Sequence, residues 1–141
     1  MFHVKHSTRN WKMKRNIFSF CNQKGGVGKT TSVINIGAHL SSKGYKVLII
    51  DTDSQGNLTS GIGMERPATE STAYQLFVDN TDPASLIQKT SYTDLEIIPS
   101  NANLAGAELE LVPKIGREYC LKNQLRKINE IYDLVSDWNI F

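Results

Sequence analysis

The sequence predicts an α/β fold in which a parallel β-sheet is flanked by helices. Short apolar segments typical of buried strands alternate with segments that have helical periodicity. One segment, residues 47–50, is apolar at four successive positions, as expected of a parallel strand covered on both faces. The chain has 141 residues, of which 40% are hydrophobic, and this is enough for one domain with a buried core.

The first part of the chain has the order and length of a βαβ unit. Residues 17–21 are expected to form a short buried strand, and residues 23–29 a glycine-rich turn. A helix is expected from Thr30 to Gly44, because glycine commonly stops a helix at its C-terminal end. The strand at residues 47–50 completes the unit. The apolar face of the helix would carry Val33, Ile34, Gly37 and Leu40.

The rest of the chain continues the alternation with shorter elements. Residues 51–63 are polar and rich in glycine, which indicates a loop. Residues 116–131 repeat apolar side chains at helical spacing and predict the longest helix of this part. The other expected elements are helices at 73–78, 83–88 and 101–111, a third strand at 95–98, and a fourth strand that opens at 132–135.

Composition and charge exclude several classes of protein. No apolar run approaches the roughly 20 residues of a membrane span. Two cysteines cannot form a disulfide framework, which favours a reducing compartment; Cys21 is expected in the core and Cys120 on a helix. Residues 1–16 hold five basic residues and no acidic one, without the apolar segment of a secretory signal. The other 125 residues hold 11 basic and 14 acidic residues, so their charge gives no indication of nucleic-acid binding.

The glycine-rich turn after the first strand has the residue types that bind phosphate groups. Glycines let successive backbone N–H groups point inward and let phosphate oxygens approach closely. Lys29 can reach the terminal phosphate oxygens, the Thr30 hydroxyl can bind Mg²⁺, and the following helix adds its positive N-terminal end. The predicted nucleotide-binding residues are Lys24, Gly25, Gly26, Val27, Gly28, Lys29, Thr30 and Thr31.

These residues resemble the deviant Walker A motif of the ParA/MinD group of P-loop ATPases, with Gln23 where the strict motif has glycine. The resemblance implies a P-loop NTPase fold and the cofactors ATP and Mg²⁺. It also implies that Lys24 reaches across an ATP-dependent homodimer to the partner's phosphates, and that Lys24 and Lys29 stabilise charge on the γ-phosphate. A solvated surface lysine is the alternative interpretation of Lys24.

Two carboxylates follow the apolar strand. Acidic groups at the carboxyl end of a parallel strand can orient a water molecule for attack on a γ-phosphate, or hold metal-bound water. The segment resembles Asp-x-Asp-Pro-Gln-Gly-Asn of the ParA family, with Ser54 in place of proline. By that resemblance Asp53 orients the attacking water and holds Mg²⁺ through water, and Asp51 supports the switch I loop. The predicted switch I residues are Asp51, Asp53, Gln55, Gly56 and Asn57.

The resemblance covers residues 15–135, about the first half of a family member. Residues 22–23 and 55–57 favour ParA/Soj over MinD, and segment 101–111 also resembles ParA/Soj. The family then continues with an apolar strand that ends in the Walker B aspartate. Here Trp138 stands at that position and Asp137 one place before it. We therefore expect the N-terminal part of an ATPase domain at 17–135, truncated before the Walker B and switch II region, and an aberrant tail at 136–141.

The sequence thus predicts a ParA-type ATPase of chromosome or plasmid partitioning, impaired by truncation. The resemblance implies a ParB-type centromere-binding partner, nonspecific DNA binding by intact family members, an ATP-dependent homodimer and no membrane partner. The implied location is cytoplasmic, and nucleoid-associated for intact members. Two alternatives stay open. One is a remnant that binds nucleotide without hydrolysing it, and the other is a MinD-like membrane-associated ATPase.

Residues 1–16 are expected to be a disordered basic extension. The codons of residues 2–5 can spell TTTCACGTGAAA, a palindrome that resembles parS, the centromere site of the family. One interpretation is that residues 1–12 translate such DNA and that Met13 is the true start. A basic arm that binds nucleic acid and an unstructured tail without a role are the alternatives.

Overall fold

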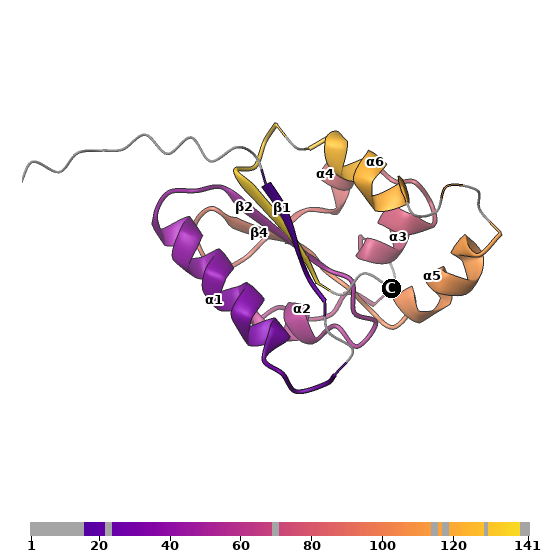
Figure 1. The fold of residues 1–141 in the computed structure, drawn as a ribbon, viewed down its shortest axis with the longest axis horizontal. Coiled ribbons are helices and arrows are strands. Elements are labelled where there is room, and N and C mark those ends of the chain that lie inside the picture. The colour runs from indigo at the N-terminus through magenta and orange to yellow at the C-terminus, as the bar shows by residue number, and fades with distance from the viewer. Residues whose placement is uncertain are drawn as a thin grey trace, which may run out of the picture.

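The computed structural model describes residues 16–21, 24–68, 71–113, 116, 119–128 and 130–138. These residues form a five-stranded sheet in the order β1-β5-β2-β4-β3, with helices on both faces (Figure 1). The pairs β1–β5, β5–β2 and β2–β4 are parallel, and β3 is antiparallel to β4. The strands are β1 (Asn16–Phe20), β2 (Val47–Asp51), β3 (Gln88–Lys89), β4 (Leu95–Ile98) and β5 (Leu134–Trp138). The predicted α/β fold is confirmed.

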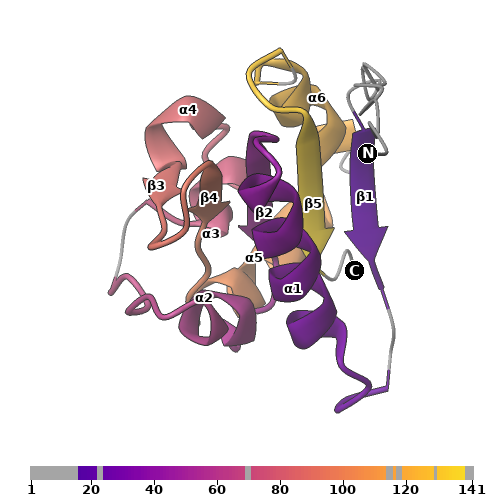
Figure 2. The same ribbon diagram turned by 90° about the vertical axis from the view of Figure 1, so that its left-hand side faces the viewer.

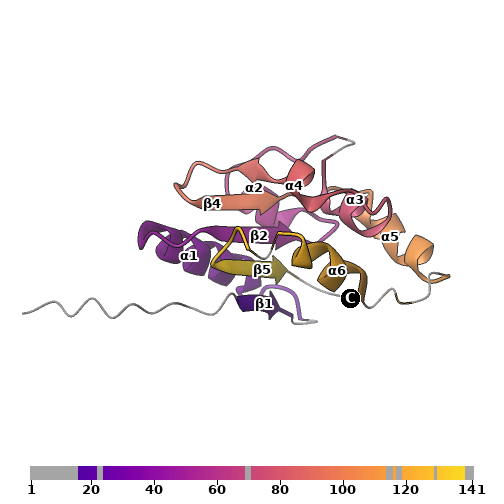
Figure 3. The ribbon, with the colours of Figure 1, turned by 90° about the horizontal axis from the view of Figure 1, so that it is seen from above.

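The helices divide into two groups by the face of the sheet that they cover. Figure 1 shows α1 and α2 on one side of the strands and α3, α5 and α6 on the other. Seen from above, β4, β2, β5 and β1 follow one another across the molecule (Figure 3). The helices are α1 (Lys29–Ser42), α2 (Asn57–Gly61), α3 (Ala73–Phe77), α4 (Pro83–Leu86), α5 (Leu104–Leu111) and α6 (Cys120–Arg126).

Strand β2 is buried along its whole length, as its apolar run predicts. Successive side chains of a strand point to opposite faces. Val47 and Ile49 accordingly pack in the cluster that contains Val33 of α1 and Leu58 of α2. Leu48 and Ile50 pack in the opposite cluster with side chains of α3, α4, α5 and α6. The central strand thus joins two separate apolar cores.

The predicted elements are present, with differences in extent. Residues 51–63 are not all loop, because α2 lies within them, and the short strand β3 follows α4 where the sequence indicates the end of a helix. The helix expected over 101–111 begins only at Leu104. The reason is local: Asn101 accepts hydrogen bonds from the backbone N–H groups of Asn103 and Leu104 and so occupies the position of a cap.

The helix expected over 116–131 is the largest error. Only Cys120–Arg126 is α-helical. At the N-terminal end, Gly116 has a left-handed φ of 77°, which is incompatible with a right-handed α-helix. At the C-terminal end, the backbone N–H groups of Ile128 and Ile131 bond to the carbonyl three residues before, as in the tighter 3₁₀ geometry. The apolar spacing nevertheless identifies buried side chains correctly, since Leu121, Leu125 and Ile128 lie in the core.

At the chain ends, β1 begins at Asn16 and β5 continues to Trp138, so residues 136–138 extend the fourth strand. The disordered extension is expected over residues 1–16; Asn16 instead belongs to β1, and residues 1–15 lie outside the described residues. Cys21 lies just beyond β1 and is exposed, so its expected place in the core is wrong.

Strand β1 forms a free edge of the described sheet. Ile17 is 47% exposed and Phe18 is 48% exposed. A hollow of about 220 Å³ beside them has almost wholly apolar walls, drawn from β1, α1, β2 and β5. Exposed apolar edges favour pairing with another chain. The residues that line the hollow are Phe18, Phe20, Val33, Ile36, Gly37, Leu40, Val47 and Leu134.

We expect the chain to self-associate through this edge, and Phe18→Lys to reduce the association without loss of secondary structure. Phe18 is half exposed, so a lysine there removes apolar surface without opening a cavity. Sedimentation velocity over a range of concentrations measures the effect. Tyr92→Lys, at a position 43% exposed between β3 and β4, is the control and should leave association unchanged. Equal association of the wild type and Phe18→Lys would contradict this expectation.

Candidate functional site

The segment between β1 and α1 has the geometry of an anion-binding loop. Gly26 and Gly28 have left-handed φ values of 71° and 81°, a region that other residues rarely adopt. Among the described residues, apart from the neighbours in the chain, no atom lies within 4 Å of where a side chain would begin at Gly25, Gly26 or Gly28, so on that side the loop borders open space. Gly28 is the N-cap of α1, whose first turn has no side-chain cap and no acidic residue. This helix end presents its positive pole and its N–H donors to the loop.

Two lysines are placed at this loop. The Lys29 Nζ atom donates a hydrogen bond to the Lys24 carbonyl oxygen across the turn, at 3.2 Å. Lys24 is exposed and Lys29 is half-buried. The pair adds two positive charges to the helix end, so the electrostatics favour a highly charged anion such as a polyphosphate.

Thr30, in the first turn of α1, lies close to Gly61 of α2. A Cβ atom at Gly61 would lie 3.3 Å from the Thr30 methyl carbon and 3.0 Å from Ile34 Cδ1. A side chain at Gly61 would therefore require Thr30 and Ile34 to shift by a few tenths of an ångström. The contact brings the segment after β2 beside the helix that carries the phosphate-type loop.

Asp51 ends β2 and is fully buried. Its Oδ2 atom accepts hydrogen bonds from the Thr59 backbone N–H at 2.8 Å and the Thr59 hydroxyl at 2.6 Å, and its Oδ1 atom accepts one from the Asp53 N–H at 3.1 Å. The Thr59 hydroxyl oxygen also accepts from the Ser100 N–H at 3.1 Å. This network, Asp51–Thr59–Ser100, ties together the end of β2, α2 and the residues after β4. Sequence reasoning missed Thr59 and Ser100.

Burial raises the pKa of Asp51 above its ordinary value, and the bonds from Thr59 and Asp53 only partly oppose that rise. A carboxyl whose pKa is higher in the folded than in the unfolded chain binds more protons when folded. Its contribution to the free energy of unfolding therefore falls as pH rises through the interval between the two pKa values.

Because the pKa of Asp51 is raised in the folded chain, we expect the wild type to gain stability relative to Asp51→Asn as pH is lowered from about 7 to about 4. Asparagine keeps one acceptor for Thr59 but does not titrate. Urea denaturation of both proteins at several pH values measures the difference in the free energy of unfolding. A difference that stays constant, or that shrinks on acidification, would contradict the raised pKa.

Asp53 lies in a compact turn formed by residues 53–57, called here the 53–57 turn. Its Oδ1 atom accepts from the Gln55 N–H at 2.9 Å, its Oδ2 atom from Asn57 Nδ2 at 3.0 Å, and its carbonyl from the Gly56 N–H at 2.8 Å. Unlike Asp51, Asp53 is only partly buried. Of the two acidic residues that the sequence singles out, Asp53 is therefore the one within reach of water.

The phosphate-type loop, the 53–57 turn and Ser100 all follow the carboxyl ends of parallel strands. The arrowheads of β1 and β5 in Figure 2 point toward the end of the molecule where α2 lies. Ligands of open α/β sheets bind at this edge. The backbone of Trp138 is in register with Asp51 and with Phe20, so the last residue of β5 also lies at this edge.

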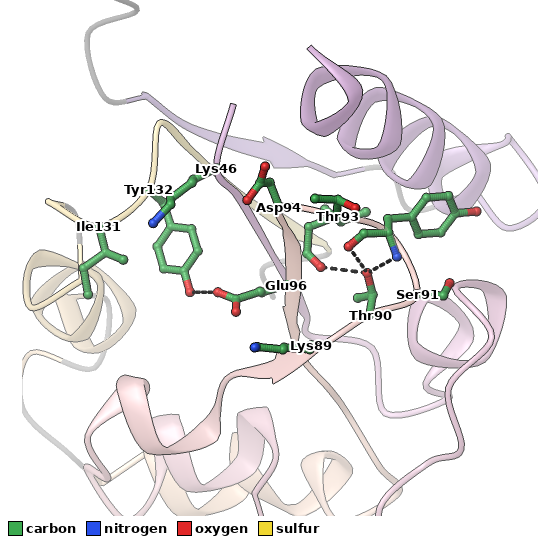
Figure 4. A pocket seen from close by; sticks show the side chains of 11 residues that line it. Lys46, Lys89, Thr90, Ser91, Thr93, Asp94, Glu96, Ile131 and Tyr132 are labelled. Carbon is green, nitrogen blue, oxygen red and sulfur yellow. Dashed lines mark hydrogen bonds between the residues drawn. The ribbon is translucent and has the colours of Figure 1, made fainter. Parts of the chain in front are cut away.

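A second cavity lies at the opposite end of the strands. It has a volume of about 430 Å³ and is bounded by the turn between β3 and β4, the start of β2 and the turn before β5. Figure 4 shows the Tyr132 hydroxyl, which donates to Glu96, with Lys46 and Lys89 nearby. Burial is the main reason that the pKa of Tyr132 is raised. No residue that the sequence predicts to be functional lines this cavity.

The AAA_31 family, described as an AAA domain, matches residues 15–136. The chain is 46% identical to the sporulation initiation inhibitor protein Soj of Bacillus subtilis over 119 residues, which are 84% of this chain and 47% of that protein. It is 37% identical to the chromosome partitioning protein ParA of Myxococcus xanthus over 127 residues, which are 90% of this chain and 45% of that protein. The chain thus spans about half the length of these curated relatives.

A crystal structure with bound ADP and magnesium resembles this fold. It is that of cobyrinic acid a,c-diamide synthase from Mycobacterium smegmatis, with a TM-score of 0.82 and 36% sequence identity. The match covers 86% of this chain and 49% of that chain. Within the described ranges, no helix is both long enough and apolar enough to cross a bilayer.

Proposed function

Because the chain belongs to the ParA/Soj family of partitioning ATPases, we propose that it binds Mg²⁺–ATP at residues 24–31. The reaction would be hydrolysis of ATP to ADP and phosphate. The observation that carries this proposal is the uncapped first turn of α1, enclosed by a loop with two left-handed glycines and carrying Lys29. Such a helix end binds phosphate through backbone N–H groups and positive charge.

In this proposal each loop residue acts on the triphosphate according to its chemistry. The Lys29 amine, which donates to the Lys24 carbonyl in the nucleotide-free chain, would exchange that bond for bonds to the terminal phosphate oxygens. Gly25, Gly26 and Gly28 leave room for the oxygens, since no described residue beyond their chain neighbours lies within 4 Å of where their side chains would begin. Lys24 would contact the phosphates of a second copy in an ATP-dependent homodimer.

The residues present fit a magnesium ion that arrives with the nucleotide. Among the described residues, no three His, Cys, Asp or Glu side chains are grouped to hold a metal by themselves. Mg²⁺ bound to a nucleotide needs few protein ligands, because phosphate oxygens and water fill most of its octahedron. The Thr30 hydroxyl would be the direct ligand and Asp53 would bind through water. The ion would neutralise charge that develops on the phosphates.

Asp53 is the residue that we propose to orient the attacking water. It lies at the carboxyl end of the sheet and is only partly buried, while Asp51 is enclosed by its own hydrogen bonds. Asp51 would act indirectly, by fixing the start of α2 and with it the 53–57 turn.

The relatives named Soj and ParA support a role in partitioning DNA. We propose a ParB-type centromere-binding protein as partner and nonspecific DNA as a further ligand of the intact assembly, with a cytoplasmic, nucleoid-associated location. These parts of the proposal concern the whole protein, about twice the length of this chain in the relatives.

Calorimetric titration of the chain with ATP and with ADP, each with Mg²⁺ and with EDTA, tests the nucleotide site. Phosphate release in the same samples tests hydrolysis. We expect saturable binding that is tighter with Mg²⁺. Absence of binding to both nucleotides would refute the proposal, and binding without phosphate release would favour a nucleotide-binding remnant. The register position of Trp138, where the sequence leads us to expect an acidic residue, is the observation that favours this second candidate.

A further inference from the structure

Arg66 makes a contact with the 53–57 turn that the sequence does not indicate. It lies five residues beyond the end of α2, in the segment that returns along the turn. Its Nη1 atom donates a hydrogen bond to the Gln55 carbonyl oxygen at 2.6 Å. Arg66 is exposed, so its contribution is not that of a core residue.

The aliphatic part of Arg66 also covers Gly56. A Cβ atom at Gly56 would lie 2.5 Å from Arg66 Cδ and 3.1 Å from Arg66 Cγ. On the other side it would lie 3.4 Å from the Ser100 carbonyl oxygen. Gly56, whose φ of 59° is left-handed, therefore lies close both to the arginine stem and to the backbone of Ser100, two residues beyond β4.

The hydrogen bond from Arg66 is made to Gln55, the residue whose N–H also bonds to the Asp53 carboxylate. Gln55 donates its N–H to the Asp53 carboxylate and accepts from Arg66 at its carbonyl. Gly56, beneath the arginine stem, donates its N–H to the Asp53 carbonyl. A movement of the backbone at Gln55 and Gly56 would break these bonds together.

We propose that Arg66 is a positioning residue that closes the 53–57 turn and so fixes the carboxylate of Asp53. Its bearing on hydrolysis rests on the proposed function, because only there does the position of Asp53 affect a reaction. The closure itself is independent of any nucleotide. Because Arg66 is exposed, its contacts with Gln55 and Gly56 affect local opening of the turn more than global unfolding of the chain.

Hydrogen exchange of the backbone amides, measured by NMR on the complete 141-residue chain, tests the closure. Arg66→Ala should raise the exchange rates of the Gln55 and Gly56 amides by about 10-fold or more, and leave those of β2 unchanged. Arg66→Lys should restore part of the protection, because a lysine stem also covers Gly56 and its amine can reach the same carbonyl.

Gly56→Ala supplies an independent test of the packing. When Arg66 is present, the methyl group added by Gly56→Ala collides with Arg66 Cδ. In the Arg66→Ala background that collision is absent, and only the strain of a left-handed alanine remains. Gly56→Ala should therefore increase the exchange of the Gln55 amide by a smaller factor in the Arg66→Ala background. Equal factors in the two backgrounds would show that Arg66 does not pack on Gly56 and would overturn the proposal.

Steady-state hydrolysis separates this inference from the proposed function. Where the chain hydrolyses ATP, Arg66→Ala should lower kcat several-fold with little change in KM, and Arg66→Lys should recover part of the loss. Unchanged exchange at Gln55 and Gly56 in Arg66→Ala overturns the inference whatever the chain does with ATP. Increased exchange in a chain that neither binds nor hydrolyses ATP supports the closure and refutes only the proposed function.

Discussion

Replacing Lys29 by alanine is expected to weaken Mg²⁺–ATP binding by about 100-fold, because the terminal phosphates lose their charge-assisted hydrogen bonds to the amine. A factor of 100 corresponds to about 2.7 kcal/mol, within the range of one or two such bonds. The fold should survive, since Lys29 is only half-buried and its amine donates to a backbone carbonyl of the loop, that of Lys24. Calorimetry of nucleotide binding and thermal unfolding of the nucleotide-free chain measure the two quantities.

Lys43→Ala is the matched control for this substitution. Lys43 is an exposed lysine at the C-cap of the same helix, at the end away from the loop. Its removal changes the net charge by the same amount and should leave the dissociation constant unchanged. If both substitutions weaken binding equally, the loss reflects overall charge, and Lys29 does not contact the phosphates.

Asp51→Ala is expected to lower the free energy of unfolding by about 3 kcal/mol, the largest stability effect that we expect in the site. The substitution removes the acceptor of three hydrogen bonds and leaves the Thr59 N–H and the Thr59 hydroxyl proton without an acceptor in a buried place. Chemical denaturation followed by circular dichroism measures the change.

Asp53→Ala serves as the comparison, because it removes an equal charge two residues away. The bonds of Asp53 lie nearer the surface, where water can replace them, so the loss should stay below about 1 kcal/mol. Thr59→Val removes only the hydroxyl from the Asp51–Thr59–Ser100 network, keeps the shape of the side chain, and should cost about 1–2 kcal/mol. Similar losses for Asp51→Ala and Asp53→Ala would show that the network is not the anchor of α2.

The parts of the fold that could be predicted carry local signals. Four successive apolar residues identify β2, and glycines beside two lysines identify the loop and the start of α1, because these features reflect the burial and backbone conformation of the residues themselves. Helix α2 has no such signal. It has only five residues, its N-cap is the left-handed Gly56, and one of its backbone N–H groups, that of Thr59, is bonded to Asp51, which lies outside the helix.

Long-range contacts explain what else sequence reasoning missed. Thr59 and Ser100 are 41 residues apart, and neither stands out in its own segment. Arg66 lies in a polar stretch that resembles any exposed loop. The different environments of Asp51 and Asp53 could have been inferred, since alternation along β2 places Asp51 on the same face as Val47 and Ile49, toward α1 and α2.

The place of β5 between β1 and β2 has a consequence for biosynthesis. In the described sheet β1 has one neighbour, β5, and each pair of facing residues, such as Asn16 and Leu134, is separated by 118 positions in the chain. Chains emerge from the ribosome in order, so β1 is made first and must wait for its partner, while β2, β4 and α1 can already pack. The strand that leads into the phosphate-type loop is then the last to be fixed, and closing so long a loop is slow. A nascent chain would therefore leave β1, with the apolar side chains of Ile17 and Phe18, without its partner strand for most of its synthesis.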